Sequence, residues 1–159
     1  IYTTPKLDGV NGTVYSSKPL SYCGNLINNF SITFKDGEAV SCTAETGLDV
    51  LKELINTDEG SKRLGEVALV PYDSPISKSN IIFFNTLYDE NASCHLALGS
   101  SYPSCIKDGD RMTEEELLNA KANSSLTHVD FMIGTKDTEI IGVKSDGTEI
   151  QIFKDGNWV

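Results

Sequence analysis

NTLYDENASCHLALGSSY, residues 85–102, is the stretch around which the chain is organised. It holds His95, one of only two histidines among 159 residues. Apolar residues directly follow that histidine, which indicates the edge of buried structure. The polar residues around it include two carboxylates, a carboxamide and a phenol: Asp89, Glu90, Asn91 and Tyr102. Because carboxylate and imidazole groups are common metal ligands, a metal site is the working hypothesis.

The composition is that of one globular domain with a buried core. The formal net charge is −10, whereas nucleic acid and anionic membrane surfaces attract clustered Lys and Arg. We therefore expect neither a nucleic-acid nor a membrane partner. No apolar run approaches the ~20 residues of a membrane span and no signal peptide is visible, so we expect a cytoplasmic location. The chain begins at Ile1 rather than Met, which favours a part of a longer polypeptide.

The four cysteines are expected to be reduced thiols. They form no Cys-x-x-Cys pair, which argues against a structural zinc knuckle. Two disulfides are possible, but a chain of this size does not need them. Cys94 precedes His95, yet neighbouring residues on a strand point to opposite faces, so a Cys-His catalytic pair is not expected there.

The first third of the chain is predicted to be antiparallel β structure. Residues 1–12 contain a proline and two Asx-Gly pairs, so we expect them to be irregular. Phe30, Ile32 and Phe34 alternate with polar residues, as in a half-buried strand, and Asp36-Gly37 predicts a hairpin turn. The strands expected here are 13–16, 26–34 and 39–43.

Two main helices are predicted. Thr46 is expected to cap the first, which presents apolar residues on one face and ends near Thr57. Thr113 and Glu116 form a capping box for the second, which is expected to end near Asn123.

The rest of the chain is predicted to be mostly strand, and the fold class to be α+β. We expect a mixed, largely antiparallel β-sheet domain with two main helices. Residues 81–84 are four consecutive apolar residues and are expected to be buried. The further strands expected are 66–70, 128–133, 139–143 and 149–153.

His128 and Asp130 form the second candidate pair. Residues i and i+2 of a strand point to the same face, so both side chains are expected to project together. An imidazole and a carboxylate so arranged can ligate one metal, or each can bind one of two. The alternative is a surface histidine beside a surface aspartate.

Each of the other candidates also has a structural interpretation. For His95 alone, a packed histidine bonded to a backbone carbonyl is the favoured interpretation. Glu66 opens an apolar strand and must be paired, protonated or bound to a cation if it is buried, but it could also face solvent. Tyr102 could be a packing residue. Asp89 and Glu90 could be acid–base groups, although capping of a turn is the favoured interpretation.

Three blocks of the sequence resemble the thermophilic-type metallo-aminopeptidases, typified by aminopeptidases T and S. They are residues 65–71 (GEVALVP), 85–99 (NTLYDENASCHLALG) and 128–134 (HVDFMIG). The blocks are long, ordered and correctly spaced, and the likeness runs from Lys18 to Trp158.

The resemblance implies an exopeptidase that removes N-terminal residues from peptide substrates with two divalent metal ions, typically zinc or cobalt. Carried over by motif, the metal ligands are Glu66, His95, Tyr102, His128 and Asp130. The implied mechanism is attack of a metal-activated water on the scissile carbonyl, with two ions ~3.5–4 Å apart. Family members are typically homodimers.

The chain departs from the family in length. Full-length members are about twice as long and carry another metal-binding glutamate in a segment that leads into one resembling residues 1–5. The chain, residues 1–159, is thus expected to be the C-terminal metal-binding catalytic domain without the N-terminal domain. No catalytic residue is assigned, because the general base is expected upstream of Ile1. The isolated chain is expected to be inactive, to bind metal weakly and to have an empty or partly filled site.

A second hypothesis is a non-enzymatic β-rich binding or oligomerisation module with structural histidines. The two hypotheses differ in geometry. The enzyme requires Glu66, His95, His128 and Asp130 to converge, whereas the module allows them to scatter.

Overall fold

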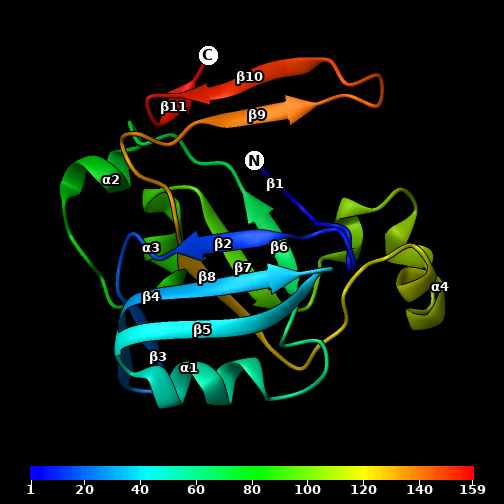
Figure 1. Cartoon of the computed structure of the whole chain (residues 1–159), viewed down its shortest axis with the longest axis horizontal. Helices are drawn as coiled ribbons and strands as arrows, with labels where there is room; N and C mark the ends of the chain where they lie inside the picture. The colour runs from blue at the N-terminus through cyan, green and yellow to red at the C-terminus, as the bar shows by residue number, and fades with distance from the viewer.

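The computed structural model describes residues 1–159, and strands dominate it (Figure 1). The strands are β1 (Tyr2–Thr3), β2 (Gly12–Tyr15), β3 (Leu20–Tyr22), β4 (Asn25–Lys35), β5 (Glu38–Thr46), β6 (Leu64–Ala68), β7 (His95–Gly99), β8 (His128–Met132), β9 (Ile140–Val143), β10 (Glu149–Lys154) and β11 (Asn157–Trp158). The α-helices are α1 (Leu48–Ile55), α2 (Pro75–Ser79), α3 (Thr86–Asp89) and α4 (Glu114–Asn119). The 3₁₀ helices are η1 (Glu90–Ala92), η2 (Pro103–Cys105) and η3 (Gly109–Arg111). None of the helices has the length and apolar character needed to cross a membrane.

The strands form three antiparallel groups, which confirms the predicted α+β class. One sheet has the order β1-β6-β7-β8, a second has the order β2-β4-β3 with β5 also paired to β4, and a third has the order β11-β10-β9. Each pair of neighbouring strands in these sheets is antiparallel. In Figure 1 the β9–β10 hairpin lies at the top of the molecule, beyond the other two sheets.

The core lies between the first two sheets. Leu96 and Leu98 of β7 belong to the core cluster, while His95 and Ala97 of the same strand point to the other face. Phe131 of β8 meets Phe30 of β4 across the layers, with ring centroids 5.6 Å apart. The sheet that carries the histidines is therefore anchored by its apolar face, and its second face is free to form a site.

Helix α1 lies along β5 at the bottom of Figure 1 and covers the second sheet. Its Leu51, Leu54 and Ile55 are buried, as the apolar periodicity predicts. The predicted cap was wrong, because Thr46 is the last residue of β5 and the N-cap is Gly47. The φ of Gly47 is 76°, a left-handed conformation that glycine adopts readily and that turns the strand into the helix.

Helix α4 has the predicted capping box of Thr113 and Glu116. It ends at Asn119, earlier than the predicted Asn123. The φ of Lys121 is +67°, which breaks the helical path. Asn123 is instead buried outside the helix, where its side chain bonds to two backbone carbonyls.

The predicted burial of residues 81–84 was wrong. Ile81, Phe83 and Phe84 are 53 %, 39 % and 58 % exposed and lie in a loop between α2 and α3. The N–H of Phe83 donates to the Asp89 carboxylate instead of to a neighbouring strand. Residues 81–84 therefore belong to no sheet. The apolar composition of the run alone could not predict that.

Three short strands were not predicted. Residues 2–3, within the segment expected to be irregular, form β1 and pair with β6. Residues 20–22 form β3, and residues 157–158 form β11 and pair with β10. All three are too short to show a periodic pattern.

All four cysteines are free, as expected.

Candidate metal centre

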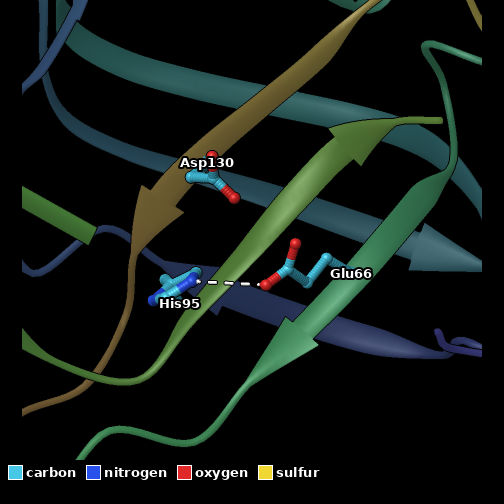
Figure 2. Close-up of side chains that lie close together, drawn as sticks. All are labelled: Glu66, His95 and Asp130. Carbon is cyan, nitrogen blue, oxygen red and sulfur yellow. Dashed lines mark ion pairs between the residues drawn. The ribbon is translucent and has the colours of Figure 1, made fainter. Parts of the chain in front are cut away.

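The register of three neighbouring strands gathers the predicted site residues on one face. Ala97 of β7 is opposite both Glu66 of β6 and Asp130 of β8. Directly opposed residues of antiparallel strands point to the same side, so the two carboxylates flank the small side chain of Ala97. His95 and His128 lie two residues before Ala97 and Asp130, and so they share that face. Figure 2 shows Glu66, His95 and Asp130 reaching from their three strands toward a common point.

The distances make these side chains one cluster. Glu66 Oε1 is 3.6 Å from His95 Nε2, and Glu66 Oε2 is 3.3 Å from His128 Nε2. His128 Nε2 is also 3.5 Å from Asp130 Oδ1. One ligand atom from each of Glu66, His95 and Asp130 lies within 4.8 Å of the others. The convergence that distinguishes the metal-site hypothesis from scattered structural histidines is present.

Backbone carbonyls orient both imidazoles. His95 Nδ1 is 3.1 Å from Ser93 O, and His128 Nδ1 is 2.7 Å from Ser100 O. A carbonyl accepts only, so each Nδ1 carries the proton and donates it. In the neutral tautomer each Nε2 then presents a lone pair toward the cluster, which is how metal-binding histidines are usually held.

The charges of the cluster are strongly coupled. Burial alone would raise the pKa of Glu66, but its ion pairs with His128 and His95 outweigh it and lower that pKa to about 2. Burial alone would lower the pKa of His128, but its ion pairs with Asp130 and Glu66 raise it to about 10. Burial likewise opposes the protonated form of His95, but the pKa of His95 is raised, mainly by its ion pair with Glu66. Protons on the imidazoles thus supply positive charge where carboxylates converge.

One oxygen of the cluster lacks a hydrogen bond. Asp130 is 7 % exposed, and its Oδ1 has no hydrogen-bond partner. Its 3.5 Å contact with His128 Nε2 is a long ion pair. A buried carboxylate oxygen without a donor is costly, and a cation beside it removes that cost. Two carboxylates and two imidazoles are also ligands that zinc, cobalt and manganese accept, so the residues present fit a divalent cation.

Tyr102 lies at the wall of the site and outside the three-residue cluster. Its ring centroid is 4.7 Å from that of His128 and 5.7 Å from that of Tyr2, and the residue is 43 % exposed. Burial and the negative charges of Glu66 and Asp130 raise the pKa of its phenol. Tyr102 therefore both packs against a histidine and borders the site.

The cluster lies in a cavity of about 870 Å³, which Tyr102 and Glu90 also line. Of the two carboxylates favoured as turn caps, only Asp89 has that role, since it accepts from the N–H groups of Phe83 and Asn85 at 2.8 and 3.1 Å. Burial and the negative charge of Asp130 raise the pKa of Glu90 to about 7. Neighbouring residues in a helical turn point in different directions, so the sequence could not tell which carboxylate faces the cavity.

The chain resembles known proteins over almost its whole length. The family described as thermophilic metalloprotease (M29) matches residues 1–158. Aminopeptidase AmpS of Bacillus subtilis (strain 168) is 60 % identical over 99 % of this chain and 38 % of its own length. Aminopeptidase PepS of Streptococcus thermophilus is 50 % identical over 100 % of this chain and 38 % of its own length.

A solved structure has the same fold. Wild-type AmpT from Thermus thermophilus aligns with a TM-score of 0.93 and 42 % identity, over 99 % of this chain and 38 % of that chain. The chain thus spans little more than a third of the length of the relatives it matches. Because the family match extends over nearly every residue, the chain belongs to the thermophilic metalloprotease (M29) family.

Proposed function

We propose that this chain provides the metal-binding side chains of a metal-dependent aminopeptidase, which releases N-terminal residues from peptides. The observation that carries the proposal is the convergence of Glu66, His95 and Asp130 in a cavity, in a chain of a metalloprotease family. The relatives are named aminopeptidases, which supports the same activity here. The convergence argues against the alternative of a β-rich module with purely structural histidines.

We infer that Glu66, His95, His128 and Asp130 hold the cations, with Tyr102 at the border of the site. Two ions, of zinc or cobalt, are proposed, and the contacts of Glu66 support that number. Its two oxygens face different histidines, so that a single carboxylate can serve two neighbouring ions. When bound, such ions polarise a carbonyl and lower the pKa of a water molecule.

The chain's own groups hold this arrangement in place. The carbonyls of Ser93 and Ser100 fix the two imidazoles, and the strand register keeps Glu66 and Asp130 on either side of Ala97. Ala97 is fully buried, and its methyl group leaves room between the two carboxylates. A larger residue there would fill that space.

The remaining expectations about the whole protein are proposals too. We propose a cytoplasmic homodimer that acts on peptides. The position of this chain as the C-terminal part, the general base upstream of Ile1 and the inactivity of the isolated chain stay predictions.

The test compares cleavage of L-leucine p-nitroanilide and its N-acetyl analogue by the complete protein. We expect cleavage of the free-amine compound only, loss of activity with a chelator, and restoration by zinc or cobalt. His95→Ala is expected to lose both metal and activity. Glu115→Gln changes an exposed carboxylate of α4 and is the matched control. Chelator-resistant cleavage, or a His95→Ala variant with full metal content, would refute the proposal.

A further inference from the structure

Tyr2 and Tyr102 form a row of aromatic rings that ends on His128. The ring centroids of Tyr2 and Tyr102 are 5.7 Å apart at an interplanar angle of 65°, which is an edge-to-face contact. The ring of Tyr102 is in turn 4.7 Å from that of His128. All three side chains line the cavity of the metal-binding cluster. The row therefore connects β1, at the edge of the sheet, to a histidine of the site.

Tyr2 is held in this row by the pairing of β1 with β6. It is directly opposite Ala68 of β6, the strand that carries Glu66. Opposed residues of antiparallel strands point to the same side, and Glu66 and Ala68 share a face because they are two residues apart. The N–H of Leu69 donates to Ile1 O at 2.7 Å and extends the pairing. Strand geometry thus directs the ring of Tyr2 to the face that carries the site.

Tyr102 has no strand that directs its side chain. It lies beyond Gly99, where β7 ends, and directly before η2, with φ −87° and ψ 118°. Its carbonyl accepts from the Cys105 N–H at 3.0 Å, which fixes its backbone but not the direction of its ring. Because the residue is 43 % exposed, close packing does not confine the ring on every side. The contacts with the rings of Tyr2 and His128 therefore restrict where the side chain points.

The direction of the Tyr102 side chain decides what its phenol oxygen can reach. The ring contacts His128, whose Nε2 is 3.3 Å from Glu66 Oε2, so a small rotation moves the oxygen toward the cluster or away from it. Groups that orient a metal ligand from outside change metal affinity about 10–100-fold when they are removed. A ring that fixes Tyr102 acts in this way when the phenol oxygen contributes to the site.

We propose that Tyr2 is a positioning residue, whose ring holds the phenol of Tyr102 toward the metal-binding cluster. The proposal rests on the proposed metal-dependent function and extends the site to β1, a strand that carries none of the inferred ligands. Tyr2 acts only through Tyr102. Removal of the Tyr2 ring therefore weakens cation binding only while Tyr102 is present.

A double-mutant cycle in the complete protein, first stripped of metal, tests this dependence through zinc affinity measured by calorimetry. Tyr2→Leu keeps an apolar side chain in β1 and removes the ring, so we expect zinc affinity to fall about 10–100-fold. Tyr2→Phe keeps the ring and is expected to bind zinc as wild type does. Tyr102→Ala is expected to weaken binding at least as much as Tyr2→Leu. Adding Tyr2→Leu to Tyr102→Ala should then change the affinity by less than about twofold.

Two controls separate positioning from damage to the fold. Tyr15→Leu removes an exposed ring from β2 that does not line the cavity, and it should bind zinc as wild type does. Tyr2 is 52 % exposed, so Tyr2→Leu should leave the fold intact, which urea unfolding of the metal-free protein checks.

The outcomes distinguish the proposal from the function on which it rests. Wild-type zinc affinity in Tyr2→Leu, weak binding by Tyr2→Phe, or additive losses in the double variant would each overturn the role of Tyr2 while the metal-dependent function stands. Wild-type affinity in Tyr102→Ala would do the same, because Tyr2 would then have no ligand to position. A wild-type protein that binds no zinc would overturn both.

Discussion

The side chain of Asn123 should contribute more to the free energy of unfolding than any surface side chain, because its hydrogen bonds connect two loops to the metal-binding sheet. It is 5 % exposed. Its Nδ2 donates to Gly60 O at 2.7 Å and to Gly99 O at 2.6 Å. Gly99 ends β7 and is opposite His128, so this contact also borders the site.

The cost of Asn123→Ala follows from these two bonds. A buried hydrogen bond whose acceptor is left without its donor costs roughly 1–3 kcal/mol. Gly60 O keeps a second donor, the Arg63 N–H at 3.0 Å, so its share lies at the low end of that range. We expect the free energy of unfolding to fall by about 2–4 kcal/mol, and the melting temperature to fall on the order of 10 °C.

Asn123→Asp tests the same contact with almost no change in shape. Its carboxylate would face two carbonyl oxygens, so burial and repulsion should raise its pKa in the folded state. A carboxyl with a raised folded pKa binds more protons when folded, so the variant becomes less stable as pH rises through that pKa. At pH 7 Asn123→Asp should therefore be less stable than Asn123→Ala, and the difference should shrink toward pH 4.

Urea unfolding followed by circular dichroism measures both effects. The matched control is Asn25→Ala, which removes an exposed amide bonded only within its own turn. The reasoning is refuted if Asn123→Ala costs less than about 1 kcal/mol. It is equally refuted if the stability of Asn123→Asp relative to Asn123→Ala does not depend on pH.

Three other predictions concern the same sheet and its surroundings. A Cβ at Gly65 would lie 2.2 Å from Ser100 O and 2.3 Å from Gly99 O. Gly65→Ala should therefore lower the free energy of unfolding by about 3 kcal/mol in urea titrations. An unchanged urea midpoint of unfolding would contradict this. Hydrogen bonds from the Leu126 N–H and the Ser125 hydroxyl lower the pKa of Asp58. The ionised carboxylate therefore stabilises the fold above pH 3.8, and this contribution is lost as pH falls through the folded pKa. In thermal melts, Asp58→Asn should lower the free energy of unfolding by about 1–2 kcal/mol at pH 7 and by little at pH 2. The pKa of His128 is about 10 without metal, so its proton must leave before Nε2 can bind a cation. Zinc affinity should therefore rise with pH below that value, and calorimetry in buffers of different ionisation enthalpy should detect the released proton. Absence of proton release at pH 7 would refute the assignment of His128 as a metal ligand.

The sequence was informative where side-chain alternation and strand geometry act together. His128 and Asp130 are two residues apart on a strand and share a face, as the period of two requires. The alternation of Phe30, Ile32 and Phe34 likewise identified β4, and all three are buried. These predictions needed only local periodicity.

The sequence was less informative where tertiary contacts decide. Four apolar residues at 81–84 predict burial, yet the loop bonds its backbone to Asp89 and leaves those side chains exposed. Thr46 has a good capping side chain, but the ladder with β4 extends through it, and Gly47 supplies the turn. Glu90 was a candidate together with Asp89, but the sequence could not separate their roles, because the position of Glu90 depends on how α3 and η1 pack against β8.

The central claim is that Glu66, His95, His128 and Asp130 together hold divalent cations, and calorimetric titration of zinc tests it most directly. The complete protein, first stripped of metal, is compared with its Asp130→Asn and His128→Ala variants and with Asp137→Asn, an exposed control. Loss of an outer hydrogen-bond partner already costs about 10–100-fold in metal affinity, so loss of a ligand should cost at least about 100-fold. The account predicts tight binding by wild type and Asp137→Asn and weak binding by both site variants. Zinc binding that is equal in all four proteins would contradict it.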